Sequence, residues 1–77
     1  MIKRSVKLYK HSTSVTLEHE FWNILHKIKE KEGVPLSQLI EKIDKWRMEK
    51  EPVPNLSSGI RLYILSTLLP DINDFSS

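Results

Sequence analysis

Hydrophobic and polar residues change their spacing along this chain, and each change marks a new element. Residues 12–18 alternate, with Val15 and Leu17 apolar between hydroxyl side chains, which is the period of a strand with one apolar face. From residue 19 the apolar residues recur every three or four positions, which is the period of a helix. The pattern therefore predicts a mainly α-helical chain with one short N-terminal strand.

The helix that follows the strand is expected over residues 19–32. Phe21, Leu25 and Ile28 lie at i, i+4 and i+7 and so share one face. Gly33 can adopt the left-handed conformation that ends a helix. This segment is expected to bury one apolar face against the rest of the chain.

Two more helices are expected, over residues 36–50 and 55–69. Pro52 and Pro54 break the helical pattern between them, and Asn55 is a good N-cap for the third helix. The third helix is apolar around most of its circumference, which predicts burial on two sides, as in a dimer core. A frayed tail follows over residues 70–77.

Residues 1–11 are expected to form a basic arm or an extra strand. Val6 and Leu8 fall on even positions, whereas Val15 and Leu17 fall on odd positions, so one continuous strand would put the pairs on opposite faces. No Gly or Pro marks a tight turn between the two pairs. The sequence therefore favours a bulge or a wide loop over a two-residue hairpin.

The strand at residues 12–18 needs a partner strand for its backbone N–H and C=O groups. A chain of 77 residues has a thin core and often gains stability by forming oligomers. We therefore expect an intertwined homodimer, in which the strands of two copies pair as an antiparallel β-ribbon. The tail is expected to be frayed, with Ile72 or Phe75 as the residue that could pack back onto the domain.

Charge is distributed unevenly along the chain. Residues 1–17 carry four basic side chains and no acidic one, whereas the net charge of the whole sequence is only +2. A basic segment beside a near-neutral body suggests a surface that faces a polyanion. The sequence has no Cys, no secretory signal and no apolar run of membrane-spanning length, so a soluble, cytoplasmic protein without membrane contact is expected.

No set of residues suggests catalysis, a cofactor or a metal ion. There is no Gly-rich phosphate loop and no nucleophile beside a plausible base, so an enzyme is not expected. His19 and His26 are two helical turns apart, which is too far for one metal ion. Trp22 and Trp46 lie in the helical pattern and are expected to pack in the core or at a dimer interface.

Several short motifs resemble the ribbon-helix-helix family of bacterial and phage DNA-binding proteins. The resemblance is closest to a subgroup of small ribbon-helix-helix domain proteins, and the expected fold is a ribbon-helix-helix with an additional C-terminal helix. The matching segments are Lys3-Arg4-Ser5-Val6, the strand from His11 to Glu18, Glu20-Phe21-Trp22, Gly33, Ser37-Gln38-Leu39-Ile40 and Asn55-Leu56-Ser57-Ser58.

This resemblance implies a homodimer whose paired strands enter the DNA major groove. The bases would be read by the outward strand residues Ser12, Ser14 and Thr16, and the backbone amides around Ser37 would anchor a phosphate. Short hydroxyl side chains stand here where the family usually has Arg, Lys, Asn or Gln, and Pro35 stands where it often has a Ser or Thr cap.

Because hydroxyls discriminate weakly between bases, phosphate contacts would supply most of the affinity. The candidates are Arg4, Lys7 and Lys10, with His11 beside them. The expected function is double-stranded DNA binding by a homodimer, or by a higher oligomer on DNA, in a transcriptional regulator or autorepressor. The alternative is an antitoxin-like or adaptor module of the same fold that binds proteins and has no significant affinity for DNA.

Overall fold

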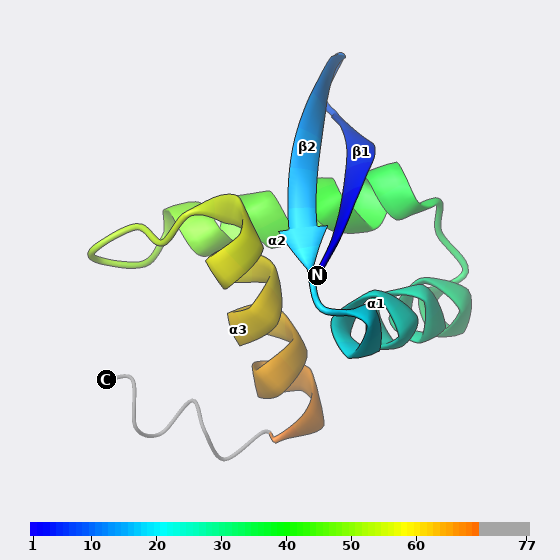
Figure 1. Cartoon of the computed structure of the whole chain (residues 1–77). Helices are drawn as coiled ribbons and strands as arrows, with labels where there is room; N and C mark the ends of the chain where they lie inside the picture. Colours follow the sequence, from blue (N-terminus) through cyan, green and yellow to red (C-terminus); the bar gives the residue numbers. More distant parts are fainter. Residues whose placement is uncertain (70–77) are drawn as a thin grey trace.

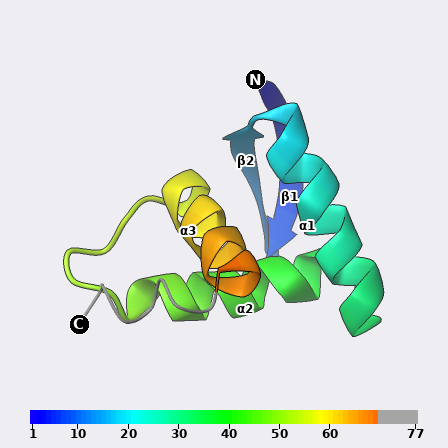
Figure 2. The same cartoon turned by 90° about the horizontal axis from the view of Figure 1, so that it is seen from below.

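Two strands and three helices make up the part of the protein that the computed structural model describes, residues 1–69. The hairpin lies across α2, and α1 and α3 lie on opposite sides of it (Figures 1 and 2). The elements in chain order are β1 (Ile2–Leu8), β2 (His11–Leu17), α1 (His19–Glu32), α2 (Leu36–Met48) and α3 (Leu56–Leu68).

The strand partner is the main correction to the expectation from sequence. β2 pairs with β1 of the same chain as an antiparallel hairpin, so the ribbon seen here is intramolecular. The loop between the strands is the two-residue turn Tyr9-Lys10, and the expectation of a bulge or a wide loop was wrong. Tyr9 takes the left-handed conformation, with φ of 59°, although it is not glycine.

In β1 the apolar residues Val6 and Leu8 occupy even positions, and in β2 Val15 and Leu17 occupy odd positions. This hairpin brings both sets to the same face. Its register pairs Ile2 with Leu17 and Val6 with Thr13, so an even position in β1 always faces an odd position in β2. Paired residues of an antiparallel ribbon point to the same side. Val6 and Val15 therefore share one face, which packs against the helices.

The core lies between this face of the hairpin and the three helices. Full burial of one aliphatic side chain stabilises the fold by about 1.5–3 kcal/mol, so the buried apolar residues make the main favourable contribution to the stability of the fold. Trp22, rather than the expected Phe21, opens the buried face of α1, while Phe21 is half-buried. The buried apolar residues are Val6, Val15, Leu17, Trp22, Leu25, Ile28, Leu39, Ile40, Ile43, Ile60 and Ile64.

Local signals set the helix ends. Gly33 has φ of 68°, its N–H bonds to the carbonyl of Glu30, and the N–H of Val34 bonds to that of Lys29, which is the Schellman arrangement. Asn55 caps α3 as expected, because its Oδ1 accepts a hydrogen bond of 2.9 Å from the N–H of Ser58. α2 and α3 are each shorter than the expected ranges.

The third helix buries only one side within a single chain. Ile60 and Ile64 are fully buried, whereas Leu62 and Leu68 are 41% and 54% exposed. The packing expected for Ile72 or Phe75 lies outside the described residues. No helix within residues 1–69 is both long and apolar enough to cross a membrane.

Candidate nucleic-acid interface

The hairpin face that points away from the helices carries only lysine and hydroxyl side chains. Because the side chains of a strand alternate between faces, the residues of this outer face follow from the strand register. All are exposed except Thr16, which is half-buried. The facing pairs are Lys3 with Thr16, Ser5 with Ser14 and Lys7 with Ser12.

Neither strand contains an acidic residue, so positive charge on the outer face is not neutralised within the hairpin. Lys3 and Lys7 lie four positions apart on β1, which places them about 13 Å apart along the strand. The hydroxyls of β2 lie beside them and can donate or accept hydrogen bonds. The face as a whole is cationic at one strand and polar but uncharged at the other.

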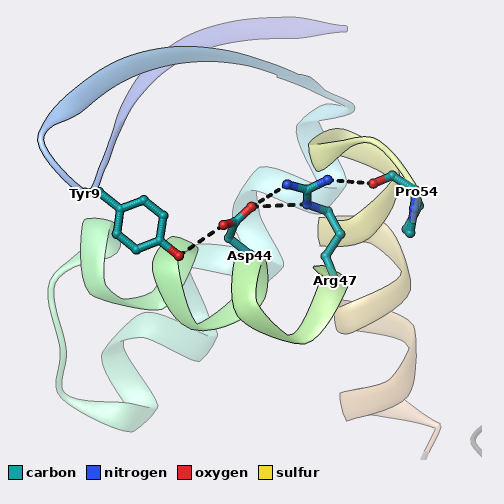
Figure 3. Close-up of polar contacts among 4 residues, drawn as sticks. All are labelled: Tyr9, Asp44, Arg47 and Pro54. Carbon is teal, nitrogen blue, oxygen red and sulfur yellow. Dashed lines mark hydrogen bonds and ion pairs between the residues drawn. The ribbon is translucent and has the colours of Figure 1, made fainter. Parts of the chain in front are cut away.

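The turn of the hairpin is fixed to α2 by hydrogen bonds. The N–H of Tyr9 donates to Oε2 of Glu41 at 3.0 Å, and the Tyr9 hydroxyl donates to Oδ2 of Asp44 at 3.1 Å (Figure 3). Desolvation and the Asp44 carboxylate both raise the pKa of the Tyr9 phenol above its usual value of 10.0. These contacts hold Tyr9 in a backbone conformation that the residue itself disfavours.

Asp44 also accepts hydrogen bonds from Arg47, near the C-terminal end of α2. Arg47 donates to Oδ1 of Asp44 through Nη2 at 2.5 Å and to the carbonyl of Pro54 through Nη1 at 2.8 Å (Figure 3). Asp44 is the one charged residue buried among the described residues, and its carboxylate is fully partnered. The guanidinium thus connects the hairpin turn, α2 and the loop before α3.

Gly59 of α3 makes room for the Arg47 side chain. A Cβ at position 59 would lie 2.5 Å from Cδ of Arg47 and 2.9 Å from its Cγ. Glycine is therefore required at this position by close approach and not by backbone conformation. The contact lets α3 pack directly against α2 near the buried ion pair.

The structure brings together four of the eight site residues expected from the sequence. Lys7, Ser12, Ser14 and Thr16 all lie on the outer face of the hairpin. Lys10 lies in the turn next to Tyr9 and is exposed. These five residues form one continuous surface along the ribbon and its tip.

Arg4, His11 and Ser37 lie elsewhere. Arg4 is opposite Val15 in the register and therefore belongs to the side that faces the helices, where its guanidinium carbon lies 5.4 Å from the centre of the Trp22 ring. His11 is opposite Leu8 on that same side, although its own side chain is exposed. Both residues flank the outer face without belonging to it.

Ser37 lies in the first turn of α2, one helical turn before Glu41, which places it near the tip of the hairpin. The N–H of the next residue, Gln38, already donates to the carbonyl of Pro35 at 3.1 Å. The phosphate anchor expected there would therefore rest on the amides of Leu36 and Ser37. Pro35 precedes the helix without a side-chain cap.

Two residues of the outer face, Lys3 and Ser5, were missed by sequence reasoning. The signal that could have found them is the opposite phase of the apolar residues in the two segments. A hairpin pairing that puts Val6 and Val15 on one face necessarily puts Lys3 and Ser5 on the other. The sequence left open whether residues 1–11 form an arm or an extra strand; the extra strand is confirmed, but its faces could not be assigned without its register.

The outer face continues toward the N-terminal end of α3. A shallow hollow of about 350 Å³ is bordered there by Ser14 and Thr16 of β2, by the cap residue Asn55 and by Ser57 and Arg61 of α3, among others. Arg61 donates to both carboxylate oxygens of Glu18, at 2.9 and 3.2 Å, and this pairing holds the pKa of Glu18 below its usual range. The ion pair fixes α3 against the end of β2.

The sequence matches the ribbon-helix-helix domain family over residues 1–68. The chain belongs to the ribbon-helix-helix family. No curated protein and no solved structure matches this sequence. Ribbon-helix-helix domains are typically DNA-binding and generally non-catalytic.

Proposed function

We propose that this ribbon-helix-helix protein binds double-stranded DNA as a homodimer and inserts the outer face of its hairpin into the major groove. The observation that carries the proposal is the composition of that face, which has exposed lysines and hydroxyls and no acidic or large apolar side chain. We further propose that it acts in the cytoplasm of a bacterial cell as a transcriptional regulator or autorepressor.

The shape of the ribbon supports this mode of binding. The major groove is about 12 Å wide and admits a two-stranded ribbon, whose strands are about 4.8 Å apart. In the dimer proposed below, the two β2 strands would form a central pair of this width, with one β1 strand on each side. The hairpin passes in front of α2 in Figure 1, and no helix is drawn over it.

The side chains divide into base readers and phosphate contacts. Ser12, Ser14 and Thr16 can bond to base edges, and Lys3 and Lys7 can reach O6 and N7 of guanine or the nearby phosphates. We propose that Lys10 and His11 near the tip, and Arg4 from the side that faces the helices, contact phosphates, and that the amides at Ser37 add one more contact. Binding dominated by these cations would weaken steeply as salt is raised.

The two-stranded sheet leaves one edge of each strand without a partner strand within the described residues. We propose that β2 pairs antiparallel with β2 of a second copy. The sheet would then have four strands, so only its two central β2 strands would enter the groove with their hydroxyls, while the two outer β1 strands would bring their lysines to the phosphates on either side. Unpaired strand edges favour such association, and a chain of this size gains core by it.

Fluorescence anisotropy of labelled duplex DNA at two salt concentrations tests the proposal. The double variant Lys3→Ala/Lys7→Ala is expected to bind on the order of tenfold more weakly, with a salt slope lower by about one unit for each lost phosphate contact. The control Lys27→Ala/Lys45→Ala removes the same charge from the helices and should bind as the parent does. Equal binding by all three proteins would refute the role of the outer face.

A parent protein that is dimeric but does not bind DNA at low salt would instead favour the protein-interaction module. The dimer itself can be tested by cross-linking, because the sequence has no cysteine. Single variants Ser12→Cys, Thr13→Cys and Ser14→Cys scan for the two-fold axis, since a residue on the axis faces its own copy within disulfide distance. If none cross-links more than the control Lys45→Cys, the β2 pairing is wrong.

A further inference from the structure

A groove between α1 and α3 has no described segment over it. Its volume is about 390 Å³, and apolar side chains from both helices form its floor. Ile28 is nearly buried there, whereas Leu68 is 54% exposed. The residues that border the groove are Ile24, Lys27, Ile28, Lys31, Thr67 and Leu68.

The charge around this groove has one sign. Lys27 and Lys31 lie one turn apart on α1, both are exposed, and no acidic residue borders the groove. Two hollows along α2 differ, because Glu41 and Glu49 stand there among the lysines. The α1–α3 groove therefore suits an acidic segment that also carries large apolar side chains.

The sequence that follows α3 has this composition. Residues 70–77 read Pro-Asp-Ile-Asn-Asp-Phe-Ser-Ser, with two acids, two large apolar residues and no base. We propose that this segment binds the α1–α3 groove of its own chain. Ile72 and Phe75 would cover the apolar floor, and Asp71 and Asp74 would face the two lysines.

The reach of the chain permits this contact. Leu68 borders the groove and is also the last residue of α3, so the segment starts at the groove. An extended chain covers about 3.4 Å per residue, which lets Phe75 reach on the order of 24 Å from Leu68. The floor residues Ile24 and Ile28 are only about 6 Å apart along α1.

Attachment to the same chain also favours this occupant over a second copy. A segment joined to its binding site within one chain has an effective concentration of about millimolar, far above the micromolar concentrations at which the protein would be studied. Contacts of modest affinity therefore suffice to fill the groove. The resulting interaction would be independent of protein concentration.

The test is an NMR comparison of the isoleucine methyl signals of Ile24 and Ile28. A chain stopped after Leu69 and the full-length variant Ile72→Ser/Phe75→Ser are both expected to shift these signals in the same way, while Ile43 in the core stays unchanged. A synthetic peptide of residues 70–77, added to the shortened chain, should move the signals back. The same peptide with serine at positions 72 and 75 should not.

Reversing the charge of the two lysines beside the groove provides a second test. Lys27→Glu/Lys31→Glu in the shortened chain should weaken peptide binding several-fold, whereas Lys45→Glu on α2 should not. Methyl signals that are the same with and without residues 70–77 would overturn the proposal. Signals that depend on protein concentration would also overturn it, because they would indicate that a second copy fills the groove.

Discussion

The two faces of the hairpin have the same backbone and opposite chemistry. The inner face holds Val6, Val15 and Leu17, all buried against the helices. The outer face, one residue out of phase, holds lysines and hydroxyls that no described element covers. Because strand side chains alternate, the fold depends on one set of positions and recognition can depend on the other. A change on the outer face can therefore alter binding without altering stability.

The largest effect is expected from the inner face. Leu17 has no exposed surface, so Leu17→Ala should lower the free energy of unfolding by about 2–5 kcal/mol through lost burial and the cavity left behind. Urea denaturation measures this as a lower midpoint with an unchanged slope. Thr16, its neighbour on the outer face, provides the control, and Thr16→Ala should lower the free energy of unfolding far less. Equal losses would mean that the two faces do not divide the roles.

A smaller loss of stability is expected from a change in the turn of the hairpin. Tyr9→Phe removes only the hydroxyl bonded to Asp44, so its loss of stability should be about a third of that of Leu17→Ala. The loss should vanish when Asp44 is already alanine, which a double-mutant cycle in urea would show. A Tyr9 effect that persists without Asp44 would rule out this hydrogen bond as its cause.

The same bond makes a prediction about pH. The pKa of the Tyr9 phenol is raised in the folded chain, so the bond's contribution is fully present below the unfolded value of 10.0. It should be lost as the pH rises through the higher folded value. Denaturation curves recorded at increasing pH above about 9 should therefore converge for the parent and for Tyr9→Phe once the pH has passed the folded pKa of Tyr9.

The smallest change in stability is expected from the outer hydroxyls. Ser5→Ala/Ser14→Ala removes an exposed facing pair, so the free energy of unfolding should stay within about 0.5 kcal/mol of the parent. If these hydroxyls read bases, the preference for a selected DNA sequence over random DNA should fall while the salt slope stays the same. A lower salt slope would instead assign them to phosphate contacts.

The helices could be predicted from the sequence because their signals are local. Gly33 and Asn55 mark helix ends through their own conformational preferences, and both act there as expected. The apolar period also identifies Leu25 and Ile28 on the buried side of α1, although Trp22 and not Phe21 opens that side. Such signals need only a few neighbouring residues and no knowledge of the rest of the fold.

The hairpin could not be predicted because its turn depends on distant residues. Nothing local favours a left-handed Tyr9, and its partners Glu41 and Asp44 lie 32 and 35 residues further along the chain. Without the turn, the strand register was unknown. Lys3 was therefore missed, and Arg4 was grouped with Lys7 although the two point to opposite sides of the ribbon.

Pairing β1 with β2 inside one chain also has a kinetic consequence. Residues 2–17 close their ribbon through a two-residue loop, and hairpins of this kind form within about 1–10 μs. Each chain can therefore complete its ribbon before it meets another copy. The rate at which the hairpin forms should not depend on protein concentration, because both of its strands belong to one chain.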